Sequence, residues 1–151
     1  MHLIHRGIVN KLFKENLLIS FKQSFKKGYG IETDIHATKD NEFICFHDFT
    51  LKRILKRNLS VKNLNYSRIK EISTKFGKPI PLLKDLLKAS ENKYALFIEI
   101  KPLFSKSLLK KLIIETSGYK KCVFISFKHE NIFNLLNILM FKRNKYTFLI
   151  S

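Results

Sequence analysis

Four short apolar runs in this chain are each followed directly by charged or polar residues. The runs cover residues 2–4, 29–31, 43–46 and 95–98, and they are followed by His5 and Arg6, Glu32 and Asp34, His47 and Asp48, and Glu99 and Lys101. Runs of this length predict β-strands, in which side chains two positions apart point to the same face. We therefore expect Glu32 to share a face with Asp34, and Glu99 with Lys101.

Segments with helical periodicity separate these runs. The pattern predicts strands at residues 2–5, 29–35, 43–47, 94–100, 122–127 and 146–150, and helices at 16–27, 67–72, 82–89, 105–116 and 130–141. Ser105 or Ser107 would cap the fourth of these helices, and Pro81 would sit in the first turn of the third. Strands that alternate with helices are typical of α/β proteins with a mostly parallel sheet.

The four polar clusters share a position relative to the predicted strands, because each follows a strand directly. Right-handed crossovers between parallel strands place the carboxyl ends of the strands on one side of the sheet. We therefore expect all four clusters to meet at one end of a sheet or barrel. Two imidazoles, three carboxylates, one Arg and one Lys would suit metal-assisted chemistry on a phosphate.

The charge of the chain narrows the choice of partner. Its 151 residues, which we expect to form a single domain, carry 29 basic and 12 acidic side chains, for a formal net charge of +17. A basic balance favours phosphate esters, nucleic acid or an anionic membrane surface. Five of the basic residues are Arg and 24 are Lys. We expect no specific nucleic-acid recognition, because Arg is the residue that reads guanine.

The cysteines and the apolar stretches indicate a cytoplasmic protein. Cys45 and Cys122 each stand alone in an apolar run, so we expect buried thiols and no disulfide. The start of the chain does not have the pattern of a signal peptide. The apolar stretch at 132–141 is interrupted by Asn134 and Asn137, and it falls short of the ~18 residues of a membrane-spanning helix.

Taken together, these motifs resemble the glycerophosphodiester phosphodiesterase family, a branch of the TIM-barrel phosphodiesterases. The resemblance begins at residues 5–7, is densest over GYGIETDIHATKDNEFICFHD at 28–48, and resumes at 51–53, 80–82 and 98–101. It covers about residues 1–127. The fold that it implies is a TIM (β/α)8-type barrel, here incomplete, because about six mostly parallel strands leave it roughly two β/α units short.

The resemblance implies metal-dependent hydrolysis of glycerophosphodiesters to glycerol 3-phosphate and an alcohol. Glu32, Asp34 and Glu99 would hold one divalent cation, and their hard oxygen ligands suit Mg²⁺ or Ca²⁺. His5 and His47 would be the acid–base pair. One would protonate the leaving alcohol, and the other would take a proton from water or from a neighbouring substrate hydroxyl.

Other residues of the motifs would support this chemistry. Arg6 and Lys101 would bind phosphate oxygens and stabilise a crowded transition state. Asp48 is expected to fix its local turn and Arg53 to organise a loop, while His36 is expected to lie at the periphery.

Glu15 and Asn16 match the second half of the family's Pro-Glu-Asn-Thr motif. We expect them to contact the first loop, although Asn16 could instead be a helix N-cap. The chain departs from the family at Lys14 and Leu17, where the family has Pro and Thr, and we find no aromatic-rich wall like that of its last strands. Six strands would leave two open sheet edges, which a homo-oligomer could cover.

Three alternatives stay open. The chain could be a truncated, catalytically inactive remnant that acts at most as a binding module. It could be a basic protein that docks on anionic lipid or nucleic acid. The carboxylates could also be ordinary surface ion pairs, Glu32 and Asp34 with lysines and Glu99 with Lys101.

Overall fold

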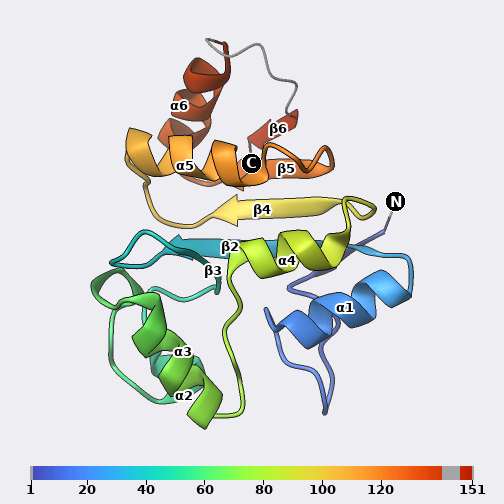
Figure 1. Ribbon diagram of the computed structural model, residues 1–151, viewed down its shortest axis with the longest axis vertical. Helices are drawn as coiled ribbons and strands as arrows, with labels where there is room; N and C mark the ends of the chain where they lie inside the picture. The colour runs from blue at the N-terminus through green and yellow to red at the C-terminus, as the bar shows by residue number, and fades with distance from the viewer. Residues whose placement is uncertain (1, 141–146, 151) are drawn as a thin grey trace.

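The computed structural model describes residues 2–140 and 147–150, and the side chains of residues 2–140. Five strands pair in parallel in the order β1, β2, β4, β5, β6, with β4 near the middle of the sheet (Figure 1). Their bounds are β1 Leu3–His5, β2 Gly30–Ala37, β4 Leu96–Ile100, β5 Cys122–Ser126 and β6 Thr147–Ile150. A further strand, β3 (Phe43–Cys45), pairs antiparallel with β2. Within the described residues β1 and β6 do not pair with each other, so the sheet is open.

Helices alternate with the strands, as the sequence predicts. They are α1 Leu18–Lys26, α2 Lys52–Leu55, α3 Tyr66–Lys75, α4 Leu83–Ser90, α5 Lys106–Thr116 and α6 His129–Met140, with a 3₁₀ turn η1 at Val61–Asn63. Helices α1 and α4 pack together, and so do α5 and α6 near β5 (Figure 1). The short α2 and the longer α3 lie together beside the β2–β3 hairpin.

The main core lies between one face of the sheet and the helices. Ile31 of β2 and Ile98 of β4 are fully buried in the same cluster as Phe21 of α1. Because neighbouring residues of a strand point to opposite faces, this burial turns Glu32 and Asp34 away from the helices. A second apolar cluster, which includes Ile44, holds β3 against α2 and α3 and so supports the hairpin.

The expectation that every strand ends on the same side of the sheet is wrong for β3. The turn after β2 is too short for a helical crossover and can only reverse the chain. In the resulting hairpin Ile35 pairs with Cys45, and the Phe46 N–H donates to the Asp34 carbonyl at 2.9 Å. His47 follows Phe46 and therefore lies beside the middle of β2, near Asp34, although the strand before it runs in the opposite direction.

Helix α1 begins two residues later than the periodicity predicts. Asn16 adopts a left-handed backbone with φ of 55°, and its N–H donates to the Arg6 carbonyl at 2.9 Å. A residue held in this way cannot start a helix, so Leu17 takes the N-cap position. The expected contact of Asn16 with the first loop is confirmed, and its alternative role as a helix cap is not.

Two other helices show how local hydrogen bonds set their first residues. The Leu82 N–H donates to the Asp85 carboxylate at 3.3 Å, so α4 starts at Leu83 and Pro81 precedes the cap instead of occupying the first turn. Ser105 caps α5, as expected. The last predicted helix is expected to end at residue 141 and the last predicted strand to start at residue 146, and both of these residues lie outside the described part of the chain.

Candidate active site

The register of the parallel strands brings three carboxylates together at one end of the sheet. Asp34 and Glu99 are paired positions of β2 and β4, and His5 is paired with Glu32 across β1 and β2. One oxygen from each of Glu32, Asp34 and Glu99 lies within 4.8 Å of the others. The structure therefore gathers residues from separate stretches of the sequence into one acidic cluster.

Two basic residues lie directly against this cluster. The Arg6 Nε is 3.0 Å from the Asp34 Oδ2, and the Lys101 Nζ is 2.9 Å from the Glu99 Oε1 and 3.4 Å from the Asp34 Oδ1. Asp34 is fully buried, whereas Lys101 and Glu99 are partly accessible. These contacts partly neutralise three carboxylates that would otherwise repel one another.

The electrostatics of the cluster act on Glu32 and Lys101 in different ways. Burial, together with the charges of Asp34 and Glu99, raises the pKa of Glu32 to about 7, against the opposing effect of Arg6 and Lys101. Burial acts to lower the pKa of Lys101, but its contacts with Glu99 and Asp34 outweigh burial and raise that pKa. The cluster thus favours positive charge in its immediate surroundings.

The oxygen atoms of this cluster fit a divalent cation. The Glu32 Oε2 and the Asp34 Oδ1 are buried and accept no hydrogen bond within the described part of the chain, although basic groups lie within 3.5 Å. Buried polar atoms normally have a partner, so these two oxygens need an explanation. Three carboxylates supply the hard oxygen ligands that such ions take. Glu32, Asp34 and Glu99 could therefore hold one divalent metal ion.

His5 stands at the exposed rim of the cluster. Its side chain is 70% exposed, and its Nε2 is 3.5 Å from the Glu32 Oε2. The ring is thus open to solvent while one nitrogen faces the carboxylates. The structure thus brings His5 next to Glu32, because the two residues are paired positions of β1 and β2.

His47 is held by contacts with Asp48 and His36. Its Nδ1 is 2.7 Å from the Asp48 Oδ1, and its carbonyl accepts a hydrogen bond from the His36 Nε2 at 3.0 Å. Burial lowers the pKa of His36, which favours the neutral ring that donates this bond. The described contacts of His47 include none with the three carboxylates, so its place in the site rests on the position of the hairpin.

Arg53 joins two loops that border the site. Its Nε donates to the Asp48 Oδ2 at 2.7 Å, and its guanidinium also pairs with Glu15. Glu15 in turn lies 3.5 Å from the Arg6 guanidinium. A chain of charged contacts thus runs from the loop after β3 to the loop after β1, which agrees with the prediction that Arg53 organises a loop.

The sequence did not reveal how the loop after β4 is held. The buried Asn131 of α6 donates to the Pro102 carbonyl at 2.9 Å and to the Ser126 hydroxyl at 3.0 Å, and its Oδ1 accepts the Phe104 N–H at 2.9 Å. The only sequence signal is one amide side chain on a helix face that also carries Ile132. Such a residue cannot be assigned to a distant loop from its spacing alone.

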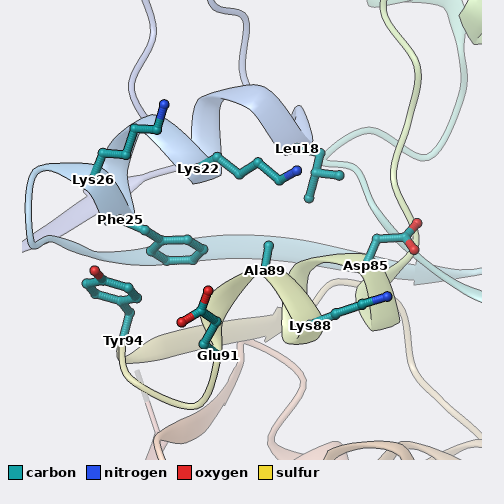
Figure 2. A pocket seen from close by; sticks show the side chains of 9 residues that line it. All are labelled: Leu18, Lys22, Phe25, Lys26, Asp85, Lys88, Ala89, Glu91 and Tyr94. Carbon is teal, nitrogen blue, oxygen red and sulfur yellow. The ribbon is translucent and has the colours of Figure 1, made fainter.

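A pocket of about 540 Å³ lies well away from this cluster, between α1 and α4 (Figure 2). Phe25 and Tyr94 stack at one end of it with ring centroids 4.7 Å apart. In Figure 2 Lys26 points upward while Lys22 and Lys88 point to the right, so the three ammonium groups do not converge on one point. None of the candidate site residues lines it, so we do not assign the chemistry to this pocket.

Comparison with solved structures identifies the fold. A crystal structure of a glycerophosphodiester phosphodiesterase from Thermotoga maritima matches 99% of this chain and 62% of that protein, with a TM-score of 0.79 and 24% identity. An Oleispira antarctica phosphodiesterase, solved in complex with the product sn-glycerol-3-phosphate, matches 98% of this chain and 64% of that protein, with a TM-score of 0.78 and 17% identity. Both likenesses are under 25% identity, and they show that the chain has the α/β fold of these two structures.

Sequence comparison gives the family. Residues 5–133 match the glycerophosphoryl diester phosphodiesterase family, and the chain belongs to that family. A glycerophosphodiester phosphodiesterase from Caldanaerobacter subterraneus is 30% identical over 143 residues, which cover 85% of this chain and 58% of that relative. The chain thus spans little more than half the length of this relative. Among the described residues, no helix is both long and apolar enough to cross a membrane.

Proposed function

We propose that this chain hydrolyses glycerophosphodiesters to glycerol 3-phosphate and an alcohol, with a divalent cation held by Glu32, Asp34 and Glu99. The observation that carries this proposal is the approach of the three carboxylates to within 4.8 Å in a member of this family. Mg²⁺ and Ca²⁺ are the proposed ions, because all three ligands are carboxylates. When bound, the cation would act as a Lewis acid on a phosphate oxygen.

His5 and His47 are the proposed acid–base pair. His5 offers an exposed ring that reaches Glu32, and the Nδ1 of His47 is engaged by Asp48, which leaves its Nε2 for proton transfer. One imidazole would protonate the leaving alcohol, while the other would take a proton from the attacking water or substrate hydroxyl. The assignment of acid and base between the two stays open.

Arg6 and Lys101 are the proposed phosphate ligands. Both are 17% exposed, and both touch Asp34 at the edge of the carboxylate cluster. A phosphate at the same edge would accept hydrogen bonds from the Arg6 guanidinium and from the Lys101 ammonium. We place this activity in the cytoplasm and in a single domain, a location supported by the two buried free thiols of Cys45 and Cys122.

The experiment is a glycerophosphocholine assay that detects glycerol 3-phosphate. Activity should require added Mg²⁺ or Ca²⁺, vanish with a chelator, and fall by about 10² to 10⁴-fold in His5→Ala and in His47→Ala. His2→Ala is the matched control, because His2 is exposed at the amino end of β1, where its ring contacts Tyr29, away from the carboxylates. Activity that survives both chelation and the loss of either imidazole would contradict the proposal.

A second candidate function is a module that binds the cation and a phosphodiester without turnover. It is supported by His47, whose contacts among the described residues include none with the three carboxylates. Metal binding by a folded sample that hydrolyses none of the glycerophosphodiesters with any divalent metal would favour this candidate.

A further inference from the structure

Four loops beside the candidate site each expose a large apolar side chain. They follow β1, β3, β4 and β5, and the residues are Leu12 at 83% exposure, Phe49 at 56%, Leu103 at 53% and Phe127 at 64%. We refer to these four residues as the apolar rim. Exposed apolar residues also occur elsewhere in the described chain, for example Ile114 and Met140, and single ones are common on protein surfaces. These four differ in that each lies on a loop that carries or contacts a residue of the candidate site, which suggests an interaction surface.

Two members of the apolar rim lie next to residues of the site. The Phe127 ring centroid is 5.9 Å from the Lys101 Nζ, and the Phe49 ring packs edge to face against His36 at 4.9 Å. His36 in turn holds the carbonyl of His47. These two aromatic residues of the apolar rim therefore lie next to the candidate site.

Each residue of the apolar rim has an exposed lysine within three positions in the sequence: Lys11, Lys52, Lys106 and Lys128. Within residues 2–140 none of these four lysines forms an ion pair with a carboxylate. Their charges are thus available to an external partner, in a chain whose formal net charge is +17. The same loops offer apolar side chains and positive charge together.

We propose that the apolar rim and its lysines dock on the surface of an anionic phospholipid bilayer. This inference rests on the proposed function, because it concerns how the same site would meet phosphodiesters presented in a lipid surface. Leucine and phenylalanine side chains would enter the region between headgroups and acyl chains, while the lysines would bind anionic headgroups. The mouth of the site would then face the phosphodiester groups of the membrane.

The composition of the rim favours a bilayer over a nucleic acid. Proteins that bind single-stranded nucleic acid stack bases on aromatic rings, and Arg contributes stacking as well as charge. Leu12 and Leu103 cannot stack on a base, and the four basic partners of the rim are all lysines. Aliphatic side chains next to lysines suit a lipid–water interface, because each part of the pair finds its preferred surroundings there.

The test measures cosedimentation of the full chain with vesicles of phosphatidylcholine alone and of phosphatidylcholine mixed with phosphatidylglycerol. Binding should be strong only with the anionic vesicles and should weaken as salt rises. The double variant Leu12→Ser with Leu103→Ser should bind at least about tenfold more weakly. Lys11→Gln with Lys128→Gln should also lose about tenfold or more.

Matched controls come from the other end of the sheet, at the end of α5 and before β5. Ile114 is 63% exposed and Lys120 is also exposed, so Ile114→Ser and Lys120→Gln should leave vesicle binding unchanged. Equal losses in the rim variants and in these controls would mean diffuse adsorption and would overturn the docking surface. Stronger binding to a DNA duplex than to anionic vesicles would overturn it too.

Hydrolysis assays separate this inference from the proposed function. Turnover of soluble glycerophosphocholine without vesicle binding would refute docking and leave the proposed function standing. Rim-dependent vesicle binding without turnover of any phosphodiester would refute the proposed function and leave docking standing. If both hold, Leu12→Ser with Leu103→Ser should retain activity on glycerophosphocholine and lose it selectively on lysophospholipid in anionic vesicles.

Discussion

His5 and Glu32 are paired positions of two neighbouring parallel strands, and the His5 Nε2 lies 3.5 Å from the Glu32 Oε2. Side chains alternate between the two faces of a strand, so a slip of one residue in β1 would move His5 to the opposite face. The pairing of an imidazole with a carboxylate is therefore set by strand register. Burial sets the face on which Glu32 lies, because the neighbouring Ile31 of β2 is fully buried and must face the helices.

Metal binding should stabilise the folded chain through Asp34. Mg²⁺ or Ca²⁺ at about 100 times its dissociation constant should raise the melting temperature by about 5 to 10 °C, because the ion binds only the folded state. Asp34→Asn should abolish this shift, since it removes a buried ligand. Glu91→Gln is the control, because Glu91 is an exposed carboxylate that pairs with Lys93. Thermal melts with and without the ion give the answer, and a full shift in Asp34→Asn would rule out the assigned site.

Arg53 should affect catalysis by positioning the His47–Asp48 pair. Arg53→Ala should lower kcat by about tenfold to a hundredfold, with a smaller change in KM, because it frees Asp48 and the hairpin end. Arg53→Lys should retain only part of the rate, because a single lysine ammonium cannot bind the carboxylates of Asp48 and Glu15 together as the planar guanidinium does. Steady-state kinetics on glycerophosphocholine measure this effect, and the pH profile should change as well.

The matched control for Arg53 is Arg57→Ala. Arg57 is exposed and lies 6.0 Å from the centroid of the Phe76 ring, without contact to either loop of the site. If Arg53→Ala and Arg57→Ala gave the same rates, the positioning role would be wrong.

Stability at low pH should depend on Asp48. Burial acts to raise the pKa of Asp48, but hydrogen bonds and charges from Arg53 and His47 outweigh burial and lower that pKa. A carboxyl whose pKa is lowered by folding stabilises the native state above its ordinary pKa, and this stabilisation is lost as pH falls through the folded pKa. Urea unfolding should therefore show Asp48→Asn to be less stable than wild type at neutral pH. The difference should shrink as the pH falls below the ordinary pKa of an aspartate.

Gly30 is required by the close approach of β2 to its neighbours. A Cβ at this position would lie 2.7 Å from the Ala95 carbonyl oxygen and 2.9 Å from the Leu3 Cδ2, so the strands would have to move apart. Gly30→Ala should lower the free energy of unfolding by about 1 to 3 kcal/mol. Gly118→Ala, where a Cβ meets nothing within 4 Å, should leave it nearly unchanged. Chemical denaturation of the two variants would settle the point, and equal stabilities would contradict it.

Asn131 should stabilise the loop that carries Leu103. Asn131→Ala would leave the Phe104 N–H and the Pro102 carbonyl without their partner, at a loss of about 2 to 4 kcal/mol in the free energy of unfolding. The nearby Asn134 is partly exposed, so Asn134→Ala serves as the control and should change stability little. Chemical denaturation measures both variants. Near-equal losses would mean that the buried hydrogen bonds of Asn131 contribute little.

Much of the carboxylate cluster could be predicted from the sequence because it depends on strand alternation. Glu32 and Asp34 are two residues apart, and Glu99 ends another apolar run, so only the order of the strands had to be assumed. That order brings β2 and β4 together, although β3 lies between them in the sequence. The family resemblance supplied what alternation could not, namely that these residues belong to one site.

The direction of β3 and the interloop contacts could not be predicted in the same way. A short polar turn precedes Phe43 in the sequence and is compatible with a hairpin. The alternation of helices and strands elsewhere in the chain nevertheless favours a parallel direction for this strand as well. Contacts such as Arg53 with Glu15 join residues 38 positions apart and depend on how two irregular loops meet. No periodicity specifies such a contact, because loops are positioned by the elements that they connect.

The hairpin means that the two imidazoles are placed by independent constraints. His5 follows the register of a parallel pair, whereas His47 follows a chain reversal whose length is set by the five residues between Ala37 and Phe43. An insertion or deletion in that turn would be absorbed in the loop, because the buried residues of β3 hold its register against β2. The backbone positions of the two histidines are thus set separately, so a variant that disturbs one of the two strands should leave the other histidine in place.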